Sequence, residues 1–478
     1  RGASLRRAEE DISSGRTPLE IVGAKGYSCL ASVASLCHTY DRPAVFVVPT
    51  PEDAVTAKRD LSDLIGSDRV VLFPAREVMP FEHGGNQESL WMRVSALAAL
   101  SSKSTPPPVV VMPATALLRF LAPPARFMEG CRLYRKGMPA SPSDLVRQLV
   151  QAGYTREFSV ETRGQIALRG GILDIFPPTG EMPFRLEIAF DEIESIRTFD
   201  PETQVSLDYI DEVFVTPASD VVDGDEGAGS TFLDYAPEAL LVVSEMGRCH
   251  DVLSEFERIG AEIASARMVA GAMDTKEASV YLTAGQVVHM LSRCHVMFSL
   301  IARAIPGVAI AGIADAESTQ QIGFAGRWND LGSEIKDLLA KKKRVVILAG
   351  NADRRLLLSR WMERQDIWTV TVDSITEEPL PGWVTLSLGS GENGFNVDPL
   401  DLCVFTEAEV YGRTQVRQRK VRKAKVSLDW RELSAGDYVV HATHGIGQFM
   451  GLKTMTVAGV TRDYLYLRYA GTDALYVP

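Results

Sequence analysis

Several features that define common classes of protein are missing from this sequence. Its six cysteines, at positions 29, 37, 131, 249, 294 and 403, form no CxxC pair, which argues against a disulfide framework or a zinc site. No apolar run approaches the roughly 18–20 residues that span a bilayer, and no signal peptide opens the chain. We therefore expect a cytoplasmic protein that has no metal site and no membrane contact.

A complete nucleotide-binding loop is also missing. A working P-loop reads GxxxxGK[ST], because backbone amides cradle the phosphates while the Lys and the hydroxyl reach the outer phosphates and Mg²⁺. Here, in VGAKGYSC, Lys25 precedes Gly26 and Tyr27 stands where the Lys belongs. Ser244 likewise replaces the Asp expected after the apolar run LLVV. The degenerate loop comprises Gly23, Lys25, Gly26 and Ser28.

The loss of both the P-loop lysine and the Asp after LLVV predicts an ATPase-like fold that cannot hydrolyse ATP. We expect no catalytic residues, no enzymatic activity and no bound cofactor in this chain.

Charge is distributed unevenly along the 478 residues. The net charge of −12 combines about +6 in residues 411–478 with about −18 in residues 1–410. An acidic body is a poor surface for duplex DNA, because neutralisation of phosphates dominates that affinity. The body is therefore expected to contact protein.

The first 125 residues alternate short apolar runs with segments of helical periodicity. The runs Ala44–Pro49, Val70–Pro74 and Val109–Pro113 are typical of strands buried on both faces. Between them, Glu52–Ile65 and Gln87–Leu100 carry apolar residues at helical spacing. The alternation predicts a parallel α/β sheet.

Residues 129–218 follow a different pattern, with one helix (Pro142–Ala152) and strands separated by Gly/Pro turns. Leu233–Val243 returns to the first pattern. We therefore expect an antiparallel α+β domain, residues 129–218, inserted into one α/β domain made of residues 1–128 and 219–325.

Three further segments are expected after residue 325. Residues 326–411 predict a second, small α/β domain with a helix at Asp353–Gln365. Residues 412–432 form a basic linker that serves either as a solvated hinge or as a contact for nucleic acid. In residues 433–478, Tyr438–Val440, two glycines and the period-2 alternation of Tyr464–Tyr469 predict a small, twisted β module.

The last module also resembles a known family. The pattern GDYVVHxxHGIGxxxGL followed by DYLxLxYAGxDxLYVP resembles the RNA-polymerase-interacting domain of the bacterial transcription-repair coupling factors, the Mfd family. The CarD-like transcription regulators share it more loosely. Upstream, FPAREVMPFEHGG, ALRGGILDIFPP, RLEIAFDEIESIRTFDPETQ and LDYAPEALLVVSEM resemble the UvrB-homology module of the same family.

The resemblance covers essentially the whole chain as the N-terminal part of that family, from the UvrB-homology module through the polymerase-interacting domain. It implies a degenerate P-loop/RecA-like domain, an inserted domain that docks UvrA, and a C-terminal SH3/Tudor-like β barrel.

For the UvrA-docking surface, the resemblance implies Arg169, Arg185, Glu187 and Phe190. Phe190 is the weaker candidate, because the family's aromatic aligns with Ala189 and a shift of one residue changes the face of a strand. The alternative is that both arginines only pair with local acids such as Glu187, Asp191 or Glu192.

For RNA polymerase, the resemblance implies that an edge strand, Gly451–Val457, adds to the β subunit. Lys453, Met455 and Val457 would share one face of that strand. Met455 serves either as the anchor or as a core methionine of the module.

Together these features predict an adaptor of transcription-coupled repair that binds the RNA polymerase β subunit and recruits UvrA. The family's ATP-driven DNA translocase motor, with its ATP, Mg²⁺ and most of the DNA contact, would follow Pro478. One alternative is a regulator that acts only through RNA polymerase, as CarD-like proteins do. Another is an active UvrB-type helicase, which would require the GK[ST] that is missing here.

Overall fold

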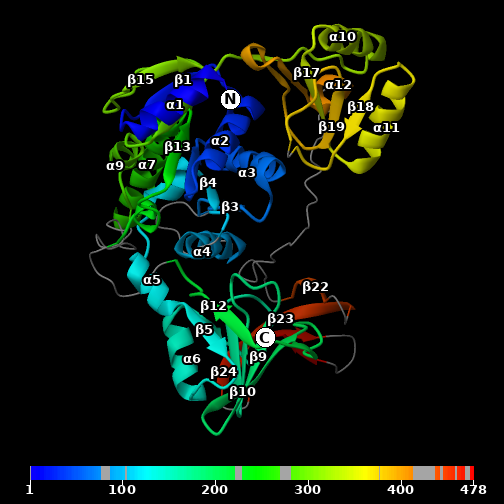
Figure 1. Cartoon of the computed structure of the whole chain (residues 1–478). Coiled ribbons are helices and arrows are strands. Elements are labelled where there is room, and N and C mark those ends of the chain that lie inside the picture. Colours follow the sequence, from blue (N-terminus) through cyan, green and yellow to red (C-terminus); the bar gives the residue numbers. More distant parts are fainter. Residues whose placement is uncertain are drawn as a thin grey trace. The chain divides into compact units, whose positions relative to one another are not determined.

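The computed structural model divides the chain into two compact units, residues 1–413 and 414–478, and each is described by itself. The first unit is described over residues 2–76, 87–102, 105–220, 229–269, 281–375 and 377–412 (Figure 1). The second is described over residues 436–441, 445–457, 460–468 and 474–477.

A seven-stranded parallel sheet forms the centre of the first unit, in the order β15-β1-β14-β13-β2-β4-β3. Its strands are β1 (Leu19–Val22), β2 (Ala44–Val48), β3 (Val70–Leu72), β4 (Val109–Pro113), β13 (Leu240–Ser244), β14 (Val296–Ser299) and β15 (Gly312–Asp315). The prediction of an α/β protein with a parallel sheet is confirmed. Strands from both sides of residues 129–218 share this sheet.

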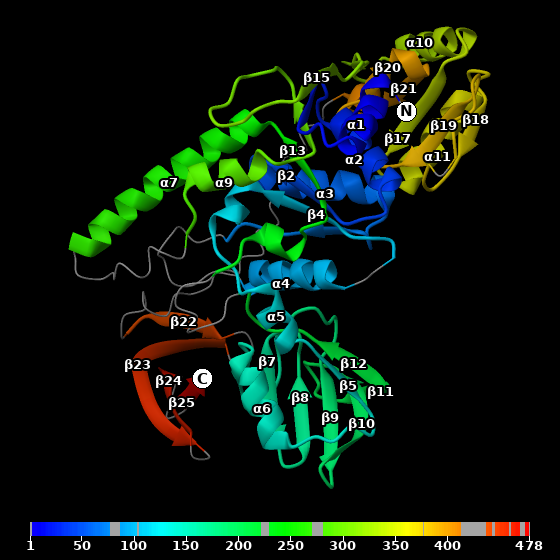
Figure 2. The ribbon, with the colours of Figure 1, turned by 60° about the vertical axis from the view of Figure 1, so that its left-hand side comes forward.

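Helices cover both faces of the sheet, which explains why its strands are apolar throughout. One face packs on α1 (Ala3–Ser13), α2 (Tyr27–Thr39) and α3 (Pro51–Ile65). The other packs on α4 (Gln87–Ser101), α7 (Met246–Val269), α9 (Ala284–Leu291) and the short helices η1 (Ala114–Leu118) and η2 (Phe232–Tyr235) (Figure 2). Helix α3 begins where Thr50 accepts the amide of Asp53, with Pro51 at the first position.

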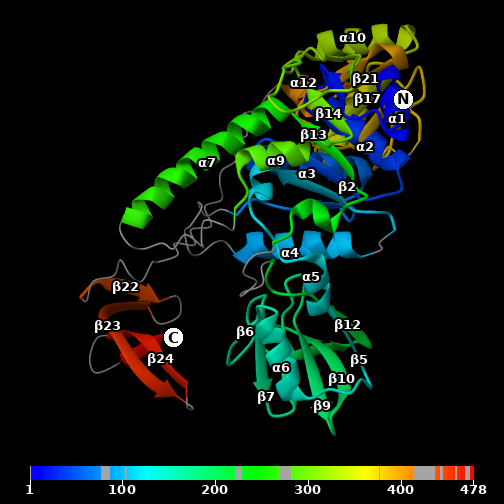
Figure 3. The ribbon, with the colours of Figure 1, turned by 90° about the vertical axis from the view of Figure 1, so that its left-hand side faces the viewer.

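A six-stranded sheet lies between β4 and β13 in the chain, in the order β11-β10-β9-β8-β7-β6. Its strands are β6 (Thr155–Arg156), β7 (Gln165–Arg169), β8 (Ile172–Ile175), β9 (Phe184–Ala189), β10 (Glu192–Phe199) and β11 (Ser206–Tyr209). All pairs except β6–β7 are antiparallel. Helix α6 (Pro142–Gln151) packs on one face (Figure 3). Helix α5 (Pro124–Gly130) and the pair β5 (Arg132–Arg135) and β12 (Glu212–Val215) lie at the joint with the parallel sheet.

A second α/β domain is built on a mixed sheet, in the order β16-β20-β21-β17-β19-β18. Its elements are β16 (Ser318–Gln320), α10 (Trp328–Ala340), β17 (Arg344–Ala349), α11 (Ala352–Glu363), β18 (Thr369–Thr371), β19 (Val384–Leu388), β20 (Phe395–Val397), η3 (Asp398–Leu400), β21 (Leu402–Phe405) and α12 (Glu407–Tyr411). Strand β16 precedes the boundary expected at residue 326.

The second unit is a four-stranded antiparallel sheet in the order β22-β23-β24-β25. Its strands are β22 (Tyr438–His441), β23 (Gly445–Val457), β24 (Val460–Arg468) and β25 (Ala474–Val477). Closure into an SH3/Tudor-like barrel and a RecA-like ancestry for the parallel sheet stay predictions. The basic run Arg413–Lys425 lies outside the described residues, as does the rest of the expected linker from residue 413.

Within the described ranges, no helix is both long and apolar enough to cross a membrane.

The joint between the parallel sheet and the inserted domain is held by a buried acid. Asp220 follows the inserted domain, and its carboxylate lies 2.6 Å from Arg93 Nε in α4 and 2.6 Å from Arg76 Nη2. Burial alone would raise the pKa of Asp220, but the two guanidinium groups outweigh burial and lower that pKa to about 2. The ion pairs therefore hold the end of the inserted domain against α4 and Arg76 of the parallel-sheet domain.

Asp220→Asn should lower the free energy of unfolding by about 3–5 kcal/mol at pH 7, because Arg93 would stay buried without its counter-charge. Since the folded pKa of about 2 lies below the unfolded value of about 3.9, the stabilisation is present above about pH 4 and is lost as the pH falls towards 2. Urea unfolding of both proteins at pH 7 and pH 3 measures this. Asp144→Asn, at an exposed position, is the control. If the gap in free energy of unfolding between wild type and Asp220→Asn is as large at pH 3 as at pH 7, the low pKa of Asp220 is contradicted.

Candidate docking surface on the inserted domain

Two hairpins place the predicted UvrA-docking residues on the six-stranded sheet. The β7–β8 turn uses Gly170, whose φ is +62°, and Gly171, where a Cβ would lie 2.5 Å from the carbonyl oxygen of Ile188. Only glycine permits that close approach of strand β9. The turn therefore leaves Arg169, the last residue of β7, at the tip of its strand.

Alternation along β9 separates the core from the candidate surface. Phe184, Leu186 and Ile188 are buried, and they pack with α6 on one side of the sheet. Arg185 and Glu187 lie between them and point to the opposite side. This period-2 pattern is the one that the sequence predicts for a half-buried strand.

Asp174 is the centre of the candidate surface. It lies opposite Arg185 in the β8–β9 register and is fully buried. Arg185 Nε and Nη2 donate to its two carboxylate oxygens at 2.7 and 3.0 Å, and Arg169 Nη2 donates to Oδ2 at 2.6 Å. One buried carboxylate is thus shared by two guanidinium groups, which gives strong, charge-assisted pairing.

The two arginines differ in their exposure. The Arg185 side chain is 13% exposed and lies over the Phe199 ring, with 4.7 Å between guanidinium carbon and ring centroid. Its hydrogen bonds to Asp174 raise the pKa of Arg185. The Arg169 side chain is 41% exposed. Arg185 is therefore held within the domain, whereas the Arg169 side chain stays partly open to solvent.

A second charged group lies beside the first. Glu187 accepts a hydrogen bond from Arg197 Nη2 at 2.7 Å and another from the Ser195 hydroxyl at 3.0 Å. The Arg197 guanidinium lies 5.5 Å from the ring centroid of the exposed Tyr209 on β11. The surface thus extends from Arg169 across three strands to the sheet edge at β11.

Phe190 lies at the tip of the β9–β10 hairpin. Phe190 and Asp191 form a two-residue turn with φ values of 52° and 58°, the left-handed pair that this hairpin type requires. A bulky residue is rarely found there, and the Phe190 side chain is fully exposed. The ring therefore belongs to neither face of β9 and projects from the end of the domain.

Both arginines pair with a local acid, as the alternative predicts, but none of the three acids named for it is the partner. Arg169 and Arg185 bind Asp174, whereas Glu187 pairs with Arg197. The cause is cross-strand register, which places Asp174 directly opposite Arg185 although eleven positions separate them in the chain. One feature of the sequence does point to Asp174, because it is an acid within the apolar strand GILDIF. A buried acid must be paired, so this position predicts an ion-pair partner.

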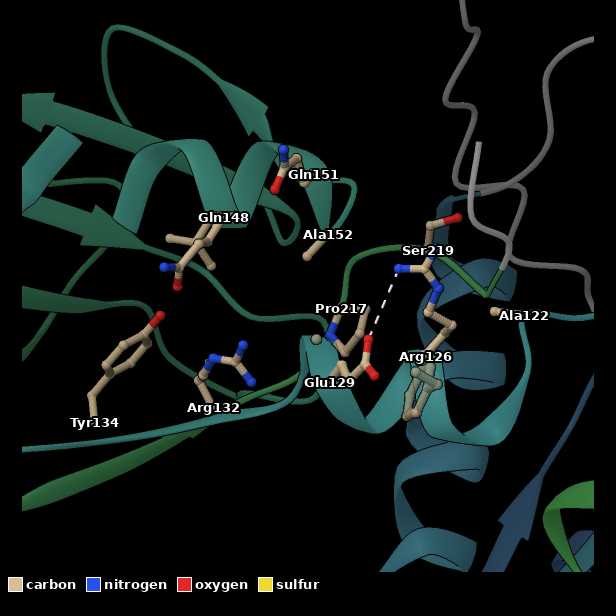
Figure 4. Close-up of a pocket in the computed structure, with 13 residues that line it drawn as sticks. Ala122, Arg126, Glu129, Arg132, Tyr134, Gln148, Gln151, Ala152, Pro217 and Ser219 are labelled. Atoms are coloured by element: carbon tan, nitrogen blue, oxygen red, sulfur yellow. Dashed lines mark ion pairs between the residues drawn. The ribbon is translucent and has the colours of Figure 1, made fainter. Parts of the chain in front are cut away.

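A cavity of about 220 Å³ lies at the joint, away from the candidate surface. It is lined by α5, β5, α6 and the segment Pro217–Ser219 (Figure 4). Arg126 and Glu129 form a weak ion pair of 3.9 Å within α5, and Gln148 of α6 lies on the other side of the opening. None of the predicted site residues lines this cavity.

The strand predicted to bind RNA polymerase is not an outermost strand. Residues Gln448–Val457 of β23 pair with β24 along one edge, and β22 pairs with the other edge only at Gly445–Gln448. Within the described part of the second unit, the remainder of that edge has no partner strand. Lys453 Nζ lies 5.8 Å from the Tyr466 ring centroid. The side chains of Met455 and Val457 lie outside the described ones.

The degenerate nucleotide loop has the expected position, between β1 and α2. Gly23 and Gly26 have positive φ values of 93° and 56°. The Ser28 hydroxyl accepts the amide of Lys25 and donates to its carbonyl, so this hydroxyl is satisfied within the loop itself. Glu245, after β13, accepts the amide of Leu300 at 2.8 Å.

Known families match two parts of the chain. Residues 134–220 match the UvrB interaction domain, and residues 433–478 match the CarD-like/TRCF RID domain. The first match covers the six-stranded sheet with its charged surface. A curated protein named transcription-repair-coupling factor, from Bacillus subtilis (strain 168), is 25% identical over 96% of this chain.

This chain is similar to the transcription-repair-coupling factors over most of its length. Proteins of that name from Staphylococcus aureus (strain MRSA252) and Staphylococcus haemolyticus (strain JCSC1435) are 25% and 26% identical over 95% and 88% of the chain. The resemblance read from the sequence is confirmed. The chain spans 44% of the length of the Bacillus subtilis and Staphylococcus aureus coupling factors and 40% of the Staphylococcus haemolyticus one.

The two arginines should contribute unequally to stability. Arg185→Ala should lower the free energy of unfolding by about 3 kcal/mol, because buried Asp174 would keep only the peripheral Arg169. Arg169→Ala should cost less than about 1 kcal/mol, because its pair is partly solvated. Urea unfolding monitored by circular dichroism compares them, and equal losses would contradict this division of roles.

Proposed function

We propose that this chain is the part of a transcription-repair coupling factor that joins RNA polymerase to UvrA. The observation that supports this best is the coincidence of the UvrB interaction match, residues 134–220, with a partly exposed, charged sheet face. The CarD-like/TRCF RID match at residues 433–478 supports RNA polymerase as the second partner. The chain would act as an adaptor without nucleotide hydrolysis of its own.

UvrA would dock on the face that carries Arg169, Glu187 and Arg197, with Phe190 at its end. Arginine and aromatic side chains are enriched at interface hot spots, and the guanidinium fork suits a carboxylate of the partner. Arg185 would act mainly by positioning Arg169 through their shared Asp174. The ATP, Mg²⁺ and DNA-translocase activity of a complete coupling factor would belong to further domains.

RNA polymerase would add a strand of its β subunit to the free part of the β23 edge. Such β-augmentation gains affinity from main-chain hydrogen bonds, while alternate side chains give specificity. Lys453, Met455 and Val457 alternate along β23 and so share one face of that strand.

The UvrA contact is tested by titrating purified UvrA against Arg169→Ala and Phe190→Ala. Each variant should weaken binding by tenfold or more, because a hot-spot side chain contributes more than about 1.4 kcal/mol. The matched control is Arg147→Ala on α6, an exposed arginine on the opposite side of the sheet. Wild-type protein that captures RNA polymerase but not UvrA would instead support a regulator that acts only through polymerase.

The polymerase contact is tested by capture of RNA polymerase with Met455→Ala and with the control Leu452→Ala, whose half-exposed side chain belongs to the other face of β23. Met455→Ala should reduce capture about tenfold and leave UvrA binding unchanged. Loss of the module's cooperative unfolding in Met455→Ala would assign this methionine to the core instead.

A further inference from the structure

The degenerate nucleotide loop faces the second α/β domain. Strand β15 pairs with β1, which leads into the loop, and β16 is the edge strand of the second sheet. Only Ala316 and Glu317 separate β15 from β16, so the chain passes from one sheet to the other almost directly. The Glu317 carboxylate also accepts the amide of Ala3 at 3.0 Å, which ties this connection to α1.

Tyr27 forms the apolar centre of the contact. It is only 4% exposed, and its ring centroid lies 6.4 Å from that of Phe395 in β20. It packs in one cluster with Val346, Leu348 and Val404 of the second sheet. Gly391 lies against the same ring, since a Cβ there would approach Tyr27 Cδ2 to 2.8 Å. The residue at the position of the P-loop lysine is therefore an anchor between two domains.

Polar groups surround this apolar centre. The Ser390 amide and hydroxyl donate to the Asp63 carboxylate at 2.8 and 2.6 Å, and the same hydroxyl lies 3.3 Å from Asp60 Oδ1. Arg59, which lies 2.8 Å from Asp60, also approaches Glu392 at 3.8 Å. Burial raises the pKa of Asp60 to about 6. These contacts join α3 to the segment that precedes β20.

Little space remains over the loop. A cavity of about 170 Å³ separates Gly23, Lys25 and Ser28 from the segments Ser318–Gln320 and Asn393–Phe395. Sites for cofactors and drug-sized ligands usually measure about 300–1,000 Å³. The Ser28 hydroxyl lies 3.4 Å from that of Ser318, across the space where a phosphate would enter.

We propose that the degenerate loop is a docking site for the second α/β domain, which covers the loop and excludes nucleotides from it. The parallel-sheet domain and residues 318–411 then form one rigid body that does not open and close in a nucleotide cycle. This role is independent of both UvrA and RNA polymerase. The sequence alone indicates no role for residues 326–411. In this proposal they cover the degenerate loop permanently.

Hydrogen exchange of the whole chain tests the seal. Gly391→Val should push the ring of Tyr27 away and speed amide exchange in Tyr27–Thr39 and in residues 390–395 by tenfold or more. The matched control is Gly323→Val in the same domain, where the nearest atom to a Cβ is 4.0 Å away. Ser390→Ala, which removes only the hydroxyl contacts, should give a smaller increase at the same amides and serves if Gly391→Val does not fold.

The second test compares hydrogen exchange of the wild-type chain with and without Mg·ATP. We expect no change in exchange at residues 23–28. Slower exchange of this loop with Mg·ATP would overturn the proposal, as would identical exchange at Tyr27–Thr39 in wild type, Gly391→Val and Ser390→Ala.

Discussion

The inserted domain is organised around one buried carboxylate whose negative charge is neutralised by arginine side chains. Asp174 lies at the centre of a six-stranded sheet with no exposure to solvent, where an unpaired charge would be costly. Arg185 neutralises it from the neighbouring strand, and Arg169 shares one of its oxygens from the tip of β7. The candidate docking arginine, Arg169, is therefore held in place through the same carboxylate that Arg185 neutralises within the sheet.

The same physical logic recurs at the joints between domains. Asp220 holds the end of the inserted domain through Arg93 and Arg76, and Asp63 with Ser390 joins the parallel-sheet domain to the second α/β domain. Buried or half-buried ion pairs and hydrogen bonds are directional, so they fix one geometry where apolar packing alone would allow several.

Much of the architecture could be predicted from the sequence, because it depends on local patterns. Continuous apolar runs such as Val109–Pro113 identify strands buried on both faces, and α3 and α4 begin and end within a residue or so of the expected segments. The pairing of Asp174 with Arg185, the inner position of β23 and the burial of Tyr27 under Phe395 depend on contacts between distant segments. Sequence periodicity carries no information about register or domain docking, so these features required the structure.

We propose that UvrA binds the charged face of the inserted domain. Hydrogen exchange of the whole chain with and without purified UvrA tests it most directly. We expect slower exchange at the β7–β8 and β9–β10 turns and along β9, with exchange in α6, on the opposite side of the sheet, unchanged. Protection confined to α6, or protection nowhere between residues 134 and 220 at saturating UvrA, would contradict it.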